Sequence, residues 1–219
     1  MKKMLFLLAL LMAVPLAVNA QRKRAFMVGI SSYRDKGRTA WNNIHGTNDV
    51  ELLKEALQKK GFQVWSVVDE QATYEGIKAT LSTFIDKTKK GDIVYLHFSC
   101  HGQPVEDGLR KGFPKGDEKD GWDEAIVPYD AWKCPIAGVY DGGNHILDDE
   151  LNVAISRIRG KIGIKGFVYV VIDACHSGGM DRGEEDEDEE MFLRGTCSGF
   201  STSNKSYVPR VDSRSNIPI

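Results

Sequence analysis

Two short polar segments follow apolar runs and contain the residues best suited to chemistry in this chain. His101 and Gly102 come soon after the apolar run 93–98, and Cys175 follows the unbroken apolar run 167–172. A cysteine peptidase needs a thiolate, a histidine that exchanges protons with the substrate, and N–H donors for a developing oxyanion. Cys175 and His101 are candidates for the first two roles, and the backbone N–H groups of Gly102 and Cys175 for the third. Because a long stretch of chain separates the two side chains, only the fold can bring them together.

Alternating apolar patterns predict the strands and helices that would position these two residues. The predicted buried strands are the apolar runs at residues 25–31, 62–68, 93–98 and 167–172. Apolar residues at helical spacing predict helices between them, with stripes at residues 50–57, 77–85 and 151–158. The candidate helix N-caps are Thr47 or Asn48, and Asp148. This alternation predicts an α/β fold with a mostly parallel sheet flanked by helices, in which functional groups gather at the carboxyl ends of the strands.

The remaining segments lack this alternation. Residues 103–145 are rich in Gly, Asp and Lys, which predicts loops and hairpins above the sheet, with residues 125–127 as the strand-like part. Residues 184–190 are seven consecutive acids, which predicts a solvated loop. Residues 198–219 are polar with isolated apolar side chains and show no core pattern. We therefore expect the domain to cover residues 21–181 and an acidic linker and polar tail to cover residues 182–219.

The first twenty residues have the pattern of a secretory signal peptide. Lys2 and Lys3 precede an almost wholly apolar stretch at residues 4–17, and residues 18–20 supply a small-x-small cleavage pattern. An uncleaved membrane anchor is the alternative, but the apolar stretch is short and is interrupted by Pro15. We expect residues 1–20 to be removed, leaving a secreted or periplasmic protein without membrane attachment.

The composition excludes several classes of protein. The 219 residues carry a formal net charge of −2, which gives no electrostatic basis for binding nucleic acid. Four cysteines are too few for a disulfide scaffold in a chain of this length. Cys134 and Cys197 could pair in an oxidising compartment, whereas Cys100 is expected to be a packed small residue.

Five motifs in order along the chain resemble those of metacaspases, which are caspase-like cysteine peptidases. They are the segments at residues 46–50, 95–102, 123–130, 146–151 and 173–178. The resemblance covers about residues 25–181. It implies the caspase–haemoglobinase fold, with His101 as the general acid/base and Cys175 as the nucleophile.

The resemblance also implies a substrate pocket formed by Asp49, Ser99 and Asp173. Two carboxylates in a recess favour Arg or Lys before the scissile bond, through charge-assisted hydrogen bonds. An aspartate there, the caspase preference, would meet like charges. The plain alternative is that Asp49 merely complements the dipole at the start of a helix.

Calcium is the cofactor that the resemblance implies, since metacaspases are commonly activated by calcium. Its ligands map by motif to Asp123, Asp148, Asp149 and Asp181, although Asp181 is one residue closer to the nucleophile than is usual in the family. Carboxylate oxygens suit calcium. Alternatively, Asp123 could lie in a solvated hairpin, Asp148 could cap a helix and Asp149 could lie in the first turn of that helix.

Three other functions compete with a peptidase. A zinc site built from the cysteines and histidines near the strand ends has no matching ligand spacing. A cysteine phosphatase needs Cys and Arg on one phosphate loop, but Arg182 lies one position beyond the usual spacing from Cys175. A non-catalytic binding or scaffold module with the peptidase fold is the third alternative.

The chain after Cys175 is short for a caspase-type domain. We expect a large subunit that lacks the small-subunit strands, so that one apolar sheet edge is exposed unless a separate or processed small subunit covers it. Basic residues around the acidic run are candidate sites of self-cleavage, namely Arg182, Arg194, Lys205, Arg210 and Arg214.

Overall fold

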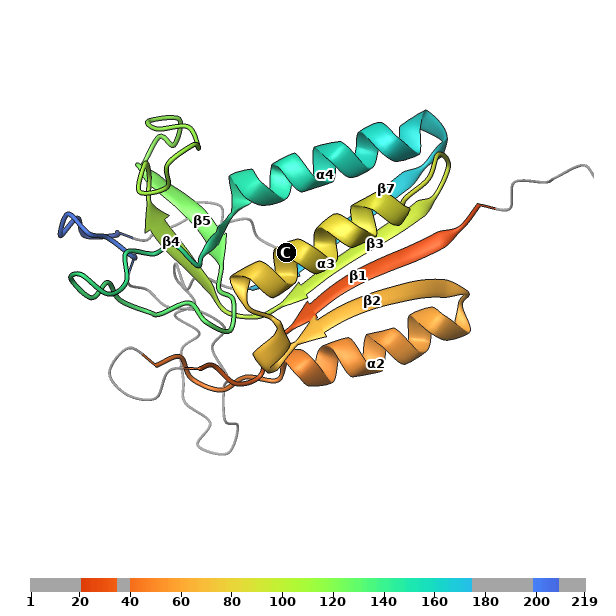
Figure 1. The fold of residues 1–219 in the computed structure, drawn as a ribbon, viewed down its shortest axis with the longest axis horizontal. Helices are drawn as coiled ribbons and strands as arrows, with labels where there is room; N and C mark the ends of the chain where they lie inside the picture. The colour runs from red at the N-terminus through yellow and green to blue at the C-terminus, as the bar shows by residue number, and fades with distance from the viewer. Residues whose placement is uncertain (1–20, 35–39, 175–198, 209–219) are drawn as a thin grey trace, which may run out of the picture.

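The computed structural model describes residues 21–34, 40–174 and 199–208. Its main sheet consists of four parallel strands in the order β2-β1-β3-β7. These strands are β1 (Lys23–Gly29), β2 (Phe62–Val68), β3 (Ile93–Ser99) and β7 (Phe167–Asp173). The predicted strands and the parallel α/β architecture are therefore confirmed, with boundaries shifted by one or two residues (Figure 1).

Helices cover both faces of this sheet. The helices are α2 (Gly46–Lys59), α3 (Tyr74–Lys87) and α4 (Asp148–Ile162), and short 3-10 turns occur at Asp69–Gln71 and Gly163–Lys165. Helices α3 and α4 pack on the face that carries Phe26, Val28 and Leu96. Helix α2 packs on the opposite face, against Ala25 and Met27. Because successive strand residues point to opposite faces, the unbroken apolar runs of the sequence fill both layers.

The helix starts differ from those predicted. Helix α2 begins at Gly46 after His45, and α4 begins at Asp148 after Leu147, without a side-chain cap on either preceding residue. The reason at α2 is close packing, since a Cβ on Gly46 would lie 2.2 Å from the carbonyl oxygen of Ser99. The hydroxyl of Thr47 does not cap the helix and instead donates to Asp69 at 2.8 Å.

A second, antiparallel sheet lies beyond the carboxyl end of the main sheet (Figure 1). Its strands are β4 (Gly102–Glu106), β5 (Trp122–Ile126) and β6 (Ile146–Leu147). Strand β4 follows β3 almost directly, and the His101 carbonyl between them accepts a hydrogen bond from Val127 N–H at 2.9 Å. The predicted loop region therefore contains a small sheet whose strands frame His101.

The segment 199–208 docks on this small sheet, which differs from the coreless tail expected from the sequence. Phe200 forms a bridge with Val105, is fully buried, and packs with Ala125 and Leu147. The sequence could not predict this docking, because a single phenylalanine between polar residues shows neither helical nor strand periodicity. A tertiary pocket alone determines its burial.

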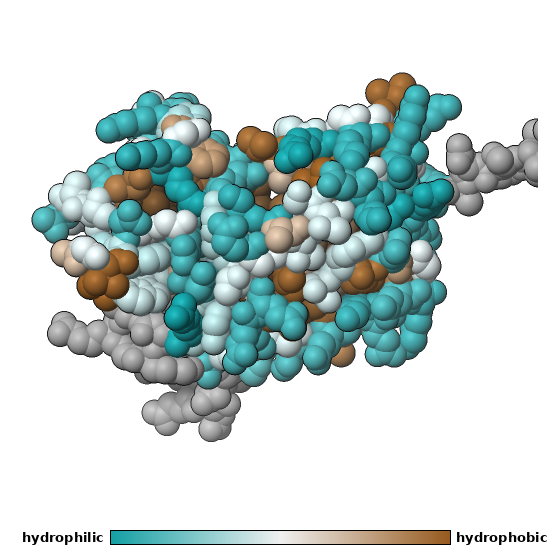
Figure 2. Space-filling view, viewed as in Figure 1, coloured by the Kyte–Doolittle hydropathy of each residue, from teal (hydrophilic) through white to brown (hydrophobic). Residues whose placement is uncertain are grey.

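Strand β7 forms one edge of the described main sheet. Phe167, Tyr169 and Ile172 on this strand are 58%, 54% and 49% exposed, in agreement with the expected apolar edge. On the face seen in Figure 2, hydrophilic side chains predominate and apolar ones form small groups among them. No helix in the described part of the chain is long and apolar enough to span a membrane.

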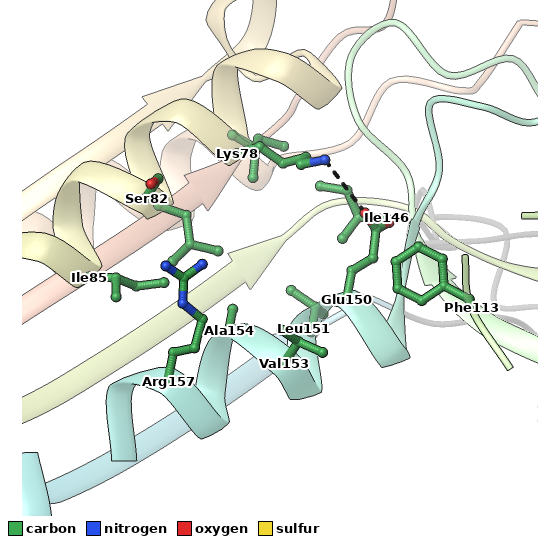
Figure 3. Close-up of a pocket in the computed structure, with 12 residues that line it drawn as sticks. Lys78, Ser82, Ile85, Phe113, Ile146, Glu150, Leu151, Val153, Ala154 and Arg157 are labelled. Atoms are coloured by element: carbon green, nitrogen blue, oxygen red, sulfur yellow. Dashed lines mark ion pairs between the residues drawn. The ribbon is translucent and has the colours of Figure 1, made fainter. Parts of the chain in front are cut away.

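A groove of about 300 Å³ lies between α3 and α4 (Figure 3). Its lining is mostly apolar and includes Leu81, Ile85 and Ala154, and Lys78 pairs with Glu150 at one end. None of the predicted catalytic or substrate-binding residues lines it. The predicted catalytic residues instead follow the carboxyl ends of β3 and β7.

Candidate active site

The strands that lead to the two predicted catalytic residues are neighbours. Strand β3 pairs with β7 in parallel, with Ser99 opposite Asp173. His101 follows Ser99 by two positions, and Cys175 follows Asp173 by two positions. Cys175 lies outside the described residues, so the structure describes the predicted catalytic histidine and the strand that leads to the predicted nucleophile.

Hydrogen bonds fix the position and tautomer of His101. Its Nε2 lies 2.8 Å from the carbonyl oxygen of Asn42, and its backbone N–H donates to the hydroxyl of Tyr33 at 2.8 Å. A carbonyl only accepts hydrogen bonds, so Nε2 of the neutral ring carries the proton. Nδ1 is then the basic nitrogen of His101, as proton exchange with a thiol requires.

Aromatic rings hold the imidazole of His101 in plane. Trp41 stacks on it with ring centroids 4.9 Å apart and an interplanar angle of 27°, and the Tyr33 centroid lies 5.1 Å away. Trp41 is itself anchored, since its Nε1–H donates to the carbonyl of Ala131 at 3.0 Å. His101 is 1% exposed, so its ring has little freedom to leave this orientation.

The predicted substrate-pocket residues meet next to His101. The Ser99 hydroxyl donates to Asp49 Oδ2 at 2.7 Å. Asp173 stands opposite Ser99 in the parallel register, and side chains at paired positions point to the same face. The structure therefore brings Asp49, Ser99 and Asp173 together on the face covered by α2. Asp49 is also in the first turn of α2, so the alternative role of complementing the helix dipole applies as well.

Three of the four predicted calcium ligands share an acidic cluster with two further carboxylates. Burial, and then the negative charges of Asp107, Asp148, Asp149 and Asp117, raise the pKa of Asp123 to about 7. Burial also raises the pKa values of Asp148 and Asp149. Within the described ranges, no three His, Cys, Asp or Glu side chains converge closely enough to hold a metal ion as they stand. Asp181, the fourth predicted ligand, lies outside those ranges.

A buried polar network joins the small sheet to the loops above it. The Gln103 amide donates to the carbonyl of Lys133 at 2.9 Å, so its Oε1 accepts from His145 Nε2 at 2.9 Å. His145 Nδ1 then accepts from the hydroxyl of Tyr140 at 3.1 Å. Burial of this ring, ahead of repulsion from Arg110, lowers the pKa of His145 to about 4. His145, the residue before β6, is thus a neutral structural histidine.

Comparison with known proteins identifies the family. A family model described as the caspase domain matches residues 22–216. The chain belongs to the caspase family. It is 32% identical to Metacaspase-2 of Arabidopsis thaliana, over 75% of this chain and 36% of that protein. It is 29% identical to Metacaspase-2 of Trypanosoma brucei brucei, over 73% of this chain and 43% of that protein.

A solved structure shares this fold. Protein GSU0716 from Geobacter sulfurreducens aligns with a TM-score of 0.54 and 26% identity, over 72% of this chain and 52% of that one. This caspase-family chain thus spans about a third to a half of the metacaspases it matches. The metacaspase resemblance and the caspase-like fold predicted from the motifs are confirmed.

The site of this caspase-family chain contains residues that the sequence did not reveal. Tyr33, Trp41 and Asn42 contact His101 from a loop before α2, and no motif marks them. Asp107 and Asp117 join the acidic cluster from the loop after β4. Their acidic character was visible in the sequence, but they lie in a loop without periodicity, so no pattern indicated that they approach Asp123.

The positions of the predicted oxyanion glycine and of the other cysteines are as follows. Gly102, the proposed oxyanion donor, is the buried first residue of β4 and pairs with Ile126. Cys100 is fully buried in the main core, as expected of a packed small residue. Cys134 is exposed, and Cys197 lies outside the described residues.

Proposed function

We propose that this protein is a cysteine endopeptidase that cleaves polypeptides after Arg or Lys through a Cys175–His101 dyad. One observation carries the proposal. Ser99, two residues before His101, donates to Asp49 at 2.7 Å and stands opposite Asp173 in the sheet. Two carboxylates thus flank Ser99 at the end of the strand that leads to His101. Family membership supports the peptidase class.

The chemistry follows from the tautomer of His101. The Cys175 thiol gives its proton to Nδ1, and the thiolate attacks the substrate carbonyl carbon. The backbone N–H groups of Gly102 and Cys175 would donate to the oxyanion. As the peptide C–N bond breaks, the imidazolium of His101 returns the proton to the leaving amine, which leaves a thioester on Cys175. Water then gives a proton to His101 and attacks the thioester, releasing the acid and restoring the thiol.

Charge supports the preference for a basic residue before the cut. A guanidinium or ammonium group entering between Asp49 and Asp173 would gain charge-assisted hydrogen bonds to carboxylates. The hydroxyl of Ser99 already orients one oxygen of Asp49, because it donates to Oδ2 at 2.7 Å. An acidic side chain would instead meet two like charges.

We also propose that calcium assists this activity. The fit rests on buried oxygens: one carboxylate oxygen on each of Asp107, Asp148 and Asp149 is buried without a hydrogen-bond partner among the described residues. Such groups are costly unless they are neutralised, and a hard divalent cation would neutralise them. Asp123, Asp148 and Asp149 would hold the ion, after a shift of these side chains toward one another, with Asp181 as the predicted fourth ligand.

Three further parts of the proposal concern the whole protein. Residues 1–20 would direct export to the periplasm or the medium, followed by signal cleavage.

Self-cleavage would occur after basic residues of the linker. Of the five candidates, Lys205 is described, and its ammonium donates to the carbonyls of Asp120 and Gly121, so we favour the four arginines Arg182, Arg194, Arg210 and Arg214. The exposed apolar edge of β7 would accept small-subunit strands.

Fluorogenic peptides that end in Arg, Lys or Asp test the proposal directly. We expect release from the Arg and Lys peptides, enhancement by calcium over chelator, and no release by Cys175→Ala or His101→Ala. Preference for the Asp peptide would overturn the pocket assignment. Wild type that behaves like Cys175→Ala would favour a scaffold role. Mass spectrometry of wild type beside Cys175→Ala tests self-cleavage, and identical fragments in both would exclude it.

A further inference from the structure

Asp69 ties the end of β1 to the start of α2. Its Oδ1 accepts from the backbone N–H groups of Ser31 and Ser32, at 2.6 and 3.1 Å. Its Oδ2 accepts from the hydroxyl of Thr47 at 2.8 Å. A single carboxylate therefore fixes two segments whose bonded residues, Ser32 and Thr47, are 15 positions apart, and it does so from a third element, the turn after β2.

The backbone at Asp69 is held in an uncommon conformation to reach these donors. Its φ is +42°, in the left-handed region that favours glycine and, among other residues, asparagine and aspartate. A non-glycine residue in this region carries a conformational cost and persists only when its surroundings hold it there. The three hydrogen bonds to the carboxylate supply that constraint.

The anchored end of α2 is the end that carries Asp49. Thr47 is bound on both sides, because its backbone N–H donates to the Ser31 hydroxyl at 2.9 Å while its own hydroxyl donates to Asp69. Two residues further along the same turn, Asp49 accepts from Ser99. The Asp69 carboxylate thus controls where the first turn of α2 sits relative to the end of β3.

We propose that Asp69 is a positioning residue for the Arg/Lys specificity pocket. This inference rests on the proposed function and adds a residue to it. Asp69 would not touch the substrate; it would act through Thr47 on the location of Asp49. Recognition of a guanidinium by carboxylates depends on direction as well as charge, so a small displacement of Asp49 weakens it.

The substitution Asp69→Asn isolates this role. Asparagine tolerates the same positive φ and its carbonyl can still accept from Ser31, but its NH₂ group can only donate to the Thr47 hydroxyl, so the charge-assisted bond that the carboxylate accepts is lost. Thr47→Val removes the other partner, and Thr47→Ser restores the hydroxyl. Glu70→Gln is the matched control, since Glu70 is the exposed adjacent acid.

Two alkylating reagents separate pocket geometry from cysteine reactivity. Iodoacetamide reports the Cys175 thiolate without the pocket, whereas an arginyl chloromethyl ketone also needs the pocket. Peptide mapping of the labelled cysteine gives both rates. We expect Asp69→Asn and Thr47→Val to slow the arginyl reagent about tenfold, the loss of one charge-assisted hydrogen bond, with the iodoacetamide rate unchanged. Thr47→Ser and Glu70→Gln should match the parent.

The outcomes distinguish this inference from the proposed function. If the parent shows no preference for the arginyl reagent over a neutral chloromethyl ketone, the proposed specificity is wrong. Hydrogen exchange then still tests the anchor, because Asp69→Asn should speed exchange in residues 45–53. Equal slowing of both reagents would show a merely structural role. Unchanged selectivity together with unchanged exchange would overturn the inference.

Discussion

Nε2 of His101 lies 2.8 Å from the backbone carbonyl oxygen of Asn42. This contact assigns the proton of the neutral imidazole to Nε2 and makes Nδ1 its basic nitrogen. This main-chain carbonyl selects one tautomer and one ring orientation of His101. A carboxylate has the same role in a Ser-His-Asp triad. The proposed dyad therefore depends on the loop that carries Asn42, and Trp41 anchors that loop through its bond to Ala131.

Replacing Trp41 by leucine should lower kcat. The substitution removes the ring that stacks on His101 and the Nε1–H bond to Ala131. Misplacement of the proton-transfer group affects the chemical step, so we expect kcat to fall about tenfold or more with KM changed less. Trp41→Phe keeps a stacking ring and should retain more activity. Steady-state kinetics with the Arg peptide gives both constants, and a change in KM alone would contradict this role.

Calcium binding should strengthen as the pH rises through 7. The pKa of Asp123 is raised to about 7 by burial and neighbouring acids, so the folded protein keeps a proton there that the unfolded chain releases near pH 4. Between these values, rising pH lowers the stability of the calcium-free protein, and calcium must displace the proton. We expect calcium to raise the melting temperature more at pH 8 than at pH 5.5.

Asp123→Asn provides the complementary measurement. Removing the buried charge should raise the melting temperature of the calcium-free protein at pH 8 by several degrees and reduce the calcium-induced shift. Glu51→Gln, on the exposed face of α2, should change neither. A full calcium shift in Asp123→Asn would remove this residue from the proposed ligand set.

Acid should destabilise the fold partly through His145. Its pKa is lowered to about 4 in the folded state, whereas an unfolded histidine titrates near 6.5. The unfolded chain therefore binds the proton first as pH falls, and stability is lost between pH 6.5 and 4, by about 3 kcal/mol from this residue. His145→Gln should show a smaller difference in unfolding free energy between pH 7 and pH 4.5 in urea titrations. The same difference in both proteins would contradict the assignment.

Phe200 should hold the segment 199–208 on the small sheet. Its ring is fully buried, and its backbone exchanges hydrogen bonds with Pro104 and Glu106 at 2.7 and 2.9 Å. Phe200→Ala should cost about 3–5 kcal/mol of unfolding free energy or release the segment. Lys205 is already exposed, but trypsin needs a backbone that can leave its fold, so release of the segment should speed cleavage after Lys205, which mass spectrometry would detect. Val208→Ala, at a side chain that is 77% exposed, is the control. Equal cleavage at Lys205 in both variants would show that Phe200 does not anchor the segment.

Much of the fold could be predicted from periodicity. The apolar runs of β1, β2, β3 and β7 identify strands, and their alternation with amphipathic helices identifies a parallel sheet. These patterns are local in the chain, so the sequence displays them directly. The small sheet β4-β5-β6 was recognised only at residues 125–127, because two of its strands are short and lie among glycines and acids.

The candidate site, too, was predictable from the sequence only in part. By itself, the sequence determined which residue types stand at the strand ends, and its ordered motifs pointed to His101, Cys175, Asp49 and Asp173. Only the tertiary structure decided that Ser99 contacts Asp49 and that Asp69 anchors the turn carrying Asp49. Only the fold, too, placed Trp41 and Asn42 against His101 and buried Phe200. These contacts join residues tens of positions apart, and loop closure over such distances depends on the packing of the whole core, which no local pattern encodes.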